Sequence, residues 1–170
     1  MLGELLSDPE GVENGGTMRG MGILPMETVF AQQKTRTRVS GQFTGTEGEW
    51  KSLEGVAIEG YEIHMGETVL REGAVPASRI RDDVTGAEKE DGAMMDQICG
   101  TYVHGIFDRR EVVEAVLNLI GRRKGVDVSQ MKGMDFAAFK ETQYDLLAEG
   151  LRKHLDMKKI YEILEQGVQA

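Results

Sequence analysis

The clearest periodic pattern in the chain lies between Lys34 and Phe43. Basic residues at every second position, from Lys34 to Arg38, alternate with threonine and valine. This alternation predicts a half-exposed strand with a basic outer face. Apolar residues on both sides of Gly60 predict another strand, and residues 68–70 predict a further one. Upstream, residues 21–24 and 27–30 are expected to form a short strand and a second extended segment around a turn at Pro25.

Two segments show no strand pattern. Residues 1–6 carry leucines at helical spacing and are expected to form a short helical turn, followed by a loop over residues 7–16. Residues 72–97 are the most polar part of the chain and are expected to be a solvated surface loop. Their acidic residues do not show the convergent spacing of a metal site. The acidic residues considered are Asp82, Asp83, Glu88, Glu90, Asp91 and Asp96.

Residues 98–107 form a compact apolar segment that predicts one strand with His104 near its end. Asp108 and Glu111 have the spacing of a capping box. Apolar residues between 112 and 120 then predict a helix, with basic residues in its last turn and Gly125 after it. His104 is therefore expected at the end of a strand that runs into a helix, the edge where ligands bind in open α/β sheets.

Residues 135–166 carry apolar residues at helical spacing. A break before Asp156 predicts a second helix that Asp156 caps. The chain is therefore expected to form strands first and helices late, without an internal repeat.

Composition narrows the class of protein. The 170 residues fit one domain, and the net charge of −9 argues against sequence-independent nucleic-acid binding. No apolar run is long enough to span a membrane, and the amino terminus lacks the features of a signal peptide. The single cysteine, Cys99, excludes an intrachain disulfide and suits a cytoplasmic protein. The 22 glycines indicate many tight turns.

The three histidines are the first candidates for chemistry. His154 lies among charged residues and is expected to be solvated. A lone histidine at a strand position is more often structural than catalytic. Neither His64 nor His104 is therefore, taken alone, evidence of an active site. The chain has no cysteine cluster for zinc and no phosphate-binding loop for ATP.

Four segments in order are more specific than any single residue. They are residues 19–30 (RGMGILPMETVF), 60–66 (GYEIHMG), 100–108 (GTYVHGIFD) and 144–164 (YDLLAEGLRKHLDMKKIYEIL). Together they resemble the glutamine amidotransferase domain of the cobyric acid synthases, from Met1 to about Leu164. Cobyrinic acid a,c-diamide synthases and the amidotransferase subunit of lipid II isoglutaminyl synthase share the general fold, but the form of residues 60–66 favours the cobyric acid synthases.

The resemblance implies a fold and a chemistry. It implies an α/β, flavodoxin-like sheet with flanking helices, as a partial domain over residues 1–166 with a tail at 167–170. It implies class I glutamine amidotransfer, in which a cysteine thiolate attacks the glutamine amide and a histidine takes the thiol proton and protonates the leaving ammonia. His104 matches that histidine. Ile106 stands where many of these enzymes carry an orienting carboxylate.

Other residues enter only through their place in the matched motifs. Candidate site-lining residues are Glu27, Tyr61, Glu62 and His64. Glu27 and Glu62 are also candidates to orient His104, and each of these two has an ordinary structural interpretation.

The family pattern differs from this chain at its start. In the family the nucleophilic cysteine lies on a strand-to-helix elbow, Gly-x-Cys-Gly-Gly-Tyr-Gln, directly before Met-Leu-Gly, and this chain starts at Met1-Leu2-Gly3. The resemblance therefore predicts that the elbow and the preceding strands are missing. It also predicts that an amino-terminal domain is missing, one that binds ATP, Mg²⁺ and the corrinoid (cobyrinic acid diamide). No cofactor or metal is expected in this chain.

Cys99 is a poor replacement for the elbow cysteine. An odd separation of five positions in one strand would point Cys99 and His104 to opposite faces, about 16 Å apart along the strand. Cys99 is therefore expected to be an apolar filler.

Three hypotheses remain open. The first is a carboxyl-terminal fragment of a cobyric acid synthase that hydrolyses no glutamine alone. The second is a non-catalytic binding module, and the third is one half of a split amidotransferase whose partner chain carries the cysteine. The expected partners are glutamine and, through the absent domain, the corrinoid, with no nucleic acid and no membrane.

Overall fold

The computed structural model describes residues 2–46, 48–129, 131 and 133–167. The chain divides into two compact units, Met1–Gly133 and Met134–Ala170. Each unit is described by itself.

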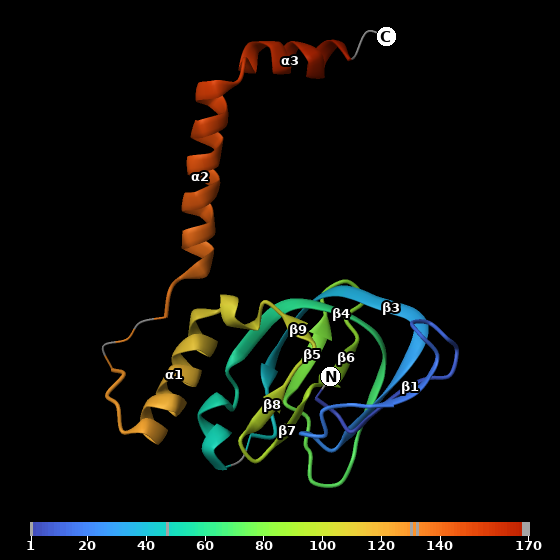
Figure 1. Ribbon diagram of the computed structural model, residues 1–170. Helices are drawn as coiled ribbons and strands as arrows, with labels where there is room; N and C mark the ends of the chain where they lie inside the picture. Colours follow the sequence, from blue (N-terminus) through green and yellow to red (C-terminus); the bar gives the residue numbers. More distant parts are fainter. Residues whose placement is uncertain (1, 47, 130, 132, 168–170) are drawn as a thin grey trace. The chain divides into compact units, whose positions relative to one another are not determined.

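The first unit is built around one sheet of mostly antiparallel strands (Figure 1). Its central path has the order β2-β1-β3-β4-β9, and β5 and β6 extend it from β3. Only the β1–β3 pairing in this sheet is parallel among the described pairs. A separate antiparallel pair joins β7 and β8. The strands are β1 (Leu5–Asp8), β2 (Gly16–Arg19), β3 (Met26–Phe43), β4 (Ala57–Leu70), β5 (Ser78–Asp82), β6 (Glu88–Asp91), β7 (Ala93–Met95), β8 (Ile98–Gly100) and β9 (Val103–His104).

Strands β3 and β4 form a long curved antiparallel pair that carries the rest of the sheet. The expected strand over residues 34–43 is confirmed, with Lys34, Arg36 and Arg38 exposed and Val39 buried. Of the two segments expected upstream, residues 27–30 belong to β3, whereas residues 21–24 form no strand, so that expectation is wrong. The segments expected around Gly60 and at residues 68–70 both belong to β4. A break in register between Val29 and Lys34 explains the interrupted sequence pattern.

Two other expectations for the first unit are wrong. Residues 5–8 form a strand and not a helical turn, because they pair with both β2 and β3. The polar segment 72–97 is not a loop throughout, since it holds β5, β6 and β7. Polar side chains of this segment pair with residues on other strands. A polar composition therefore did not reveal that the segment contains strands.

Residues 98–107 do not form the single strand expected. β8 ends at Gly100, β9 covers Val103–His104, and the 3₁₀ helix η2 covers Ile106–Asp108. Gly105 has φ 82°, a left-handed conformation that turns the chain out of β9. This turn separates His104 from the helix that follows it.

Helix α1 (Arg110–Lys124) confirms the expected helix and its end at Gly125, whose φ is 64°. The expected capping box is wrong, because the N-cap residue is Arg109 and not Asp108, and the side chain of Arg109 makes no cap hydrogen bond. Val112 and Leu119 are the buried apolar residues of α1. The helix packs beside β4 and the 3₁₀ helix η1 (Gly48–Leu53). The mixed α/β class, with a central sheet and flanking helices, is therefore confirmed.

The buried side chains of the first unit form two clusters. The larger one joins β3, η1, β4, β5, β9, η2 and α1, and the smaller one lies around Leu24, Met26 and Ala93. The larger cluster consists of Val39, Phe43, Leu53, Ile58, Ile80, Val103, Ile106 and Val112.

The second unit contains α2 (Phe136–His154) and α3 (Met157–Gln166). Asp135 and Asp156 cap them through hydrogen bonds from the amides of Ala138 and Lys159, which confirms the cap expected at Asp156. His154 is exposed, as expected. Of the tail at 167–170, residues 168–170 lie outside the described part of the chain. None of the described helices is both long enough and apolar enough to cross a membrane.

Candidate functional site

His104 lies on an exposed face of the sheet, directly opposite Tyr61. The register pairs His104 of β9 with Tyr61 of β4, and it pairs the next residues, Val103 and Glu62. Directly opposed residues point to the same side of a sheet. His104 and Tyr61 are both exposed, whereas Val103 and Glu62 are both buried. The exposed face therefore carries His104 with Tyr61, and the buried face carries Glu62.

The same exposed row continues onto β3. Arg38 pairs with Tyr61 across the sheet, so His104, Tyr61 and Arg38 stand on three neighbouring strands. Arg38 is exposed, and within the described part of the chain its guanidinium makes one long ion pair of 3.8 Å, from Nε to Asp83 Oδ2. The sequence alone did not single out Arg38. Its alternating pattern placed Arg38 on the outer face of a strand, but only the strand register puts it in line with His104.

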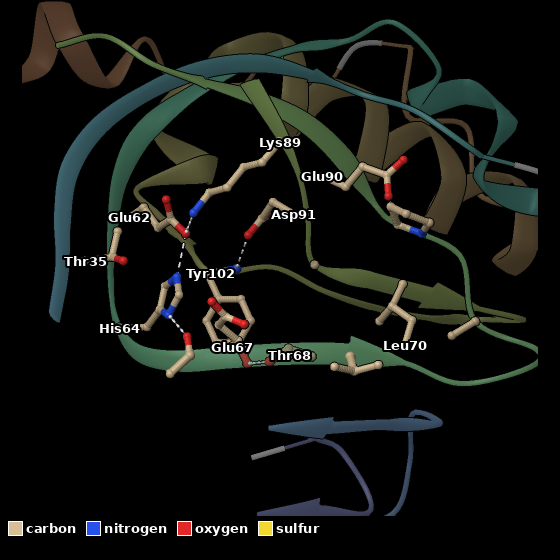
Figure 2. Close-up of a pocket in the computed structure, with 15 residues that line it drawn as sticks. Thr35, Glu62, His64, Glu67, Thr68, Leu70, Lys89, Glu90, Asp91 and Tyr102 are labelled. Atoms are coloured by element: carbon tan, nitrogen blue, oxygen red, sulfur yellow. Dashed lines mark hydrogen bonds and ion pairs between the residues drawn. The ribbon is translucent and has the colours of Figure 1, made fainter. Parts of the chain in front are cut away.

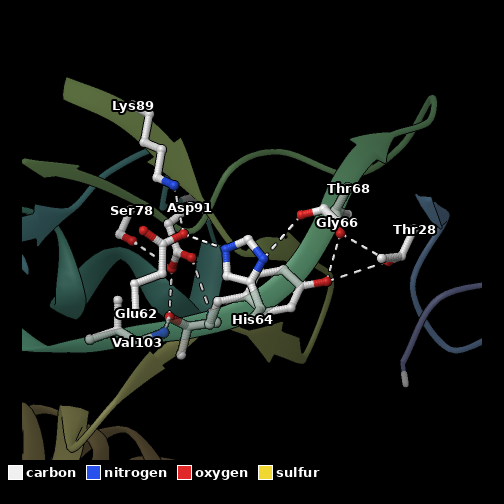
Figure 3. Close-up of polar contacts among 11 residues, drawn as sticks. Thr28, Glu62, His64, Gly66, Thr68, Ser78, Lys89, Asp91 and Val103 are labelled. Atoms are coloured by element: carbon white, nitrogen blue, oxygen red, sulfur yellow. Dashed lines mark hydrogen bonds and ion pairs between the residues drawn. The ribbon is translucent and has the colours of Figure 1, made fainter. Parts of the chain in front are cut away.

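A second polar group lies on the buried face, around Glu62. Lys89 Nζ donates to Glu62 Oε1 over 2.6 Å, and His64 Nε2 lies 2.5 Å from the same oxygen. The second ring nitrogen of His64, Nδ1, is 3.1 Å from the carbonyl oxygen of Gly66. Figure 3 shows these contacts converging from β4 and β6. Glu62 is only 2% exposed, so Lys89 and His64 provide the compensation that a buried carboxylate requires.

Asp91 and several hydroxyl groups extend this buried network. Thr101 Oγ1 donates to Asp91 over 2.6 Å, and Ser78 and the Tyr102 amide also donate to it. Burial raises the pKa of the Asp91 carboxyl and the charge of Glu62 raises it further, while the bonds from Thr101 and Tyr102 work against this rise. The network thus ties β6 to the segment between β8 and β9.

The buried network borders a cavity of about 700 Å³. Figure 2 shows Glu62, His64 and Lys89 pointing toward one another at one end of it. The ring of His64 lies 4.6 Å from that of Tyr102, centre to centre. Glu62 Oε2 has no hydrogen-bond partner among the described residues, but it is also inaccessible to solvent. A ligand in the cavity therefore could not contact this oxygen unless the Glu62 side chain moved.

The expected site residues are thus divided between different places. His104 and Tyr61 share the exposed face, and Glu62 and His64 lie on the opposite face. Glu27 belongs to neither group, since it pairs with Arg71 over 2.6 Å near the start of β3. Sequence proximity to a matched motif did not reveal this division, because neighbouring positions in a strand point to opposite faces.

Two expectations about residues near His104 are wrong. Cys99 and His104 do not share one strand, since β8 ends at Gly100 and His104 belongs to β9. Ile106 is not on a strand face with His104, because it lies in η2 and is buried in the core. The apolar pattern of residues 98–107 did not predict that the chain leaves the strand at residues 101–102 and again at Gly105.

Cys99 has the surroundings of a packing residue. It pairs with Met94 and packs against the larger core cluster. Burial, with a smaller effect of the Asp91 charge, raises the pKa of the Cys99 thiol to about 11. At neutral pH the thiol is therefore protonated, which opposes a role as a nucleophile.

No group of three or more histidine, cysteine, aspartate or glutamate side chains in the described part of the chain could hold a metal ion. The sequence also lacks a phosphate-binding loop.

Comparison with known proteins gives the family. The family model described as a CobB/CobQ-like glutamine amidotransferase domain matches residues 1–112. A curated protein of Ruminiclostridium cellulolyticum named cobyric acid synthase is 43% identical over 99% of this chain and 33% of its own length. Proteins of the same name from Lachnoclostridium phytofermentans and Citrobacter koseri are 40% and 41% identical over 34% and 33% of their lengths. The chain thus spans about a third of the length of the curated relatives that it matches, and it belongs to the CobB/CobQ-like glutamine amidotransferase domain family.

Proposed function

We propose that this chain supplies the histidine side of a glutaminase site, with His104 as the catalytic acid and base. In this function His104 takes a proton from a cysteine thiol and later gives it to the leaving ammonia. The observation that supports it best is the exposed row of His104, Tyr61 and Arg38 on three neighbouring strands. The relatives' name extends the proposal to amidation of corrin-ring carboxylates in cobalamin biosynthesis.

The spacing of this row suits glutamine. Adjacent strands lie about 4.8 Å apart, so the backbones at His104 and Arg38 are separated by about 10 Å. In extended glutamine the amide carbon and the carboxylate carbon are about 5 Å apart, given C–C bonds of about 1.5 Å. With a hydrogen bond of about 3 Å at each end, the molecule spans this distance. Glutamine lying over Tyr61 would place its amide near His104 and its carboxylate near Arg38, whose guanidinium suits a carboxylate.

The nucleophile is proposed to come from outside this chain's described elements. Cys99 is the only cysteine, and its raised pKa and core packing argue against it. We therefore expect the purified chain to hydrolyse no glutamine. Glutamine turnover above the blank that disappears in His104→Ala would contradict this expectation.

The domain assignment and the remaining partners are parts of the same proposal. Residues 1–166 are taken as one partial amidotransferase domain, because the relatives align over 98–99% of this chain. ATP, Mg²⁺ and the corrinoid would be bound by the two thirds of the relatives' length that this chain does not match. Addition of a polypeptide that carries an elbow cysteine should restore glutamine hydrolysis if the enzyme is split.

Glutamine binding gives a direct test of the row. We expect the chain to bind L-glutamine more tightly than L-glutaminamide, which lacks the α-carboxylate, and we expect Arg38→Gln to remove this preference. Arg36→Gln is the matched control, because Arg36 is exposed on the same strand but pairs with Ile63 and not with Tyr61. Calorimetry or NMR titration measures both ligands. Equal binding of the two ligands by the unchanged chain would contradict the proposed pose.

A further inference from the structure

The turn that carries His104 is attached to β4 at both of its ends. At its start, His104 pairs with Tyr61. The chain then leaves the strand through the left-handed Gly105, passes through η2 and reaches Arg109, the N-cap residue of α1. There Arg109 Nη1 lies 3.3 Å from Glu59 Oε1. Two residues of β4, at positions 59 and 61, therefore hold the two ends of the segment from His104 to Arg109.

The residue between them contacts the backbone of His104. A Cβ atom placed on Gly60 would lie 2.1 Å from the carbonyl oxygen of His104 and 2.9 Å from Val103 Cγ1. Such distances are far below ordinary contact, so β4 and β9 meet here without free space. A shift of β4 or of the far end of the turn is therefore transmitted to His104.

Arg109 connects three elements. Its Nη1 reaches Glu59 on β4, and its Nε lies 3.4 Å from Glu111 Oε2 on the first turn of α1. Its side chain is only 30% exposed, against 47% for Glu59 and 61% for Glu111. The guanidinium thus lies between the strand and the helix, where a planar group with several donors can hold two carboxylates at once.

We propose that the Arg109–Glu59 ion pair positions His104 for catalysis by fastening the His104–Arg109 turn to β4. Arg109 and Glu59 are positioning residues that act through the backbone of this turn. The inference rests on the proposed role of His104 in glutamine hydrolysis. A displacement of a catalytic group by about 1 Å lowers the reaction rate far more than it weakens substrate binding. Loss of this ion pair is therefore expected to lower mainly kcat.

The first experiment follows His104 itself by NMR of the 170-residue chain. Arg109→Gln and Glu59→Gln should each shift the amide signals of His104 and Gly105 and weaken the backbone proton contacts across the His104–Tyr61 pair. Exchange of the two charges, Glu59→Arg with Arg109→Glu, should restore both readouts. Glu111→Gln is the control, because it removes the other carboxylate partner of Arg109 and leaves the link to β4. Unchanged His104 signals in Arg109→Gln, or an equal effect of Glu111→Gln, would overturn the proposal.

The second experiment measures glutamine hydrolysis after the chain is combined with a polypeptide that supplies the elbow cysteine. We expect Arg109→Gln and Glu59→Gln to lower kcat about three- to tenfold, with KM changed less than about twofold, and the exchanged pair to recover most of the rate. A change confined to KM would overturn the proposal. If His104→Ala retains full hydrolysis while Arg109→Gln still moves the His104 signals, the positioning of the turn stands and the proposed function of His104 is wrong.

Discussion

Gly60 shows how a single residue can set the place of a proposed catalytic group. The backbone of β4 passes so close to the His104 carbonyl that no side-chain carbon fits at position 60. This requirement differs from that of a turn glycine, which is needed for its backbone angles. At Gly60 the reason is space, and the neighbour is the backbone of His104.

We expect Gly60→Ala to displace His104 and to destabilise the first unit. The new methyl group would meet a backbone oxygen, which cannot move away as a flexible side chain can. NMR should show shifted His104 signals, and thermal unfolding of the first unit should begin at lower temperature. Gly150→Ala is the control, because a Cβ at Gly150 meets no atom within 4 Å and alanine favours a helix. A Gly60→Ala variant with unchanged His104 signals would contradict the close contact.

Cys99 provides a second prediction at the level of one residue. Because burial raises the pKa of its thiol to about 11, little thiolate is present near neutral pH. We expect iodoacetamide to modify native Cys99 at pH 8 at least about a hundredfold more slowly than it modifies an exposed cysteine peptide. In denaturant the rates should become equal. Rapid modification of the native chain at pH 8 would contradict the structural interpretation and reopen Cys99 as a nucleophile.

At the scale of elements, the β1–β2 connection depends on one carboxylate. Asp8 ends β1, and its carboxylate oxygens accept hydrogen bonds from the backbone amides of Val12, Glu13 and Gly15 over 2.8, 2.9 and 2.8 Å. Burial raises the pKa of Asp8, but the backbone amides that donate to it outweigh this effect and lower the pKa below its ordinary value. The Asp8 carboxylate therefore holds this loop together with the backbone pairing of β1 and β2.

This carboxylate gives the protein a predictable pH dependence. A pKa that is lower in the folded than in the unfolded state adds stability above the unfolded value of about 3.9. That contribution is lost as the pH falls through the lower folded value. We expect Asp8→Asn to be less stable than the unchanged chain at pH 7 and to lose less stability in acid. Denaturant unfolding between pH 7 and pH 2.5 measures both, and Glu10→Gln, an exposed change in the same loop, should leave the curve unchanged. An equal acid dependence in Asp8→Asn would contradict the assignment.

At the scale of the whole molecule, the two units differ in how they are stabilised. Both clusters of buried apolar residues lie within Met1–Gly133. In the second unit, α2 and α3 have capped N-termini but no buried residue among those described. Burial of apolar surface is the main favourable contribution to the free energy of folding. The residues that stabilise the sheet are therefore expected to lie in the first unit itself.

We therefore expect a chain that ends at Gly133 to keep the fold of the sheet. Its amide signals for β3, β4 and β9 should match those of the full chain, and the backbone proton contacts across the His104–Tyr61 pair should remain. Two-dimensional NMR of the two proteins tests this expectation. Loss of the dispersed strand signals on truncation would show that the second unit contributes to the stability of the first.

Several features of this protein could be predicted from the sequence alone, because each depends on a local sequence pattern. Alternation of polar and apolar residues placed Lys34–Phe43 in a strand with a basic outer face. Helical spacing located α1, α2 and α3, and Asp156 marked the start of α3. Four ordered motifs identified the amidotransferase resemblance. These features depend on residues that lie close together in the chain, so local propensity and pattern reveal them.

The tertiary structure alone decided which of these residues meet. Strand register brings Arg38, Tyr61 and His104 into one row and puts Glu62 and His64 on the other face, although Tyr61 and Glu62 are neighbours in sequence. It also makes strands of the polar segment around Lys89 and Asp91, whose partners are Glu62 and Thr101. Pairing across a sheet joins residues far apart in the chain, and a shift of one position would exchange the two faces. For this reason the sequence could supply the candidates, and only the fold could group them.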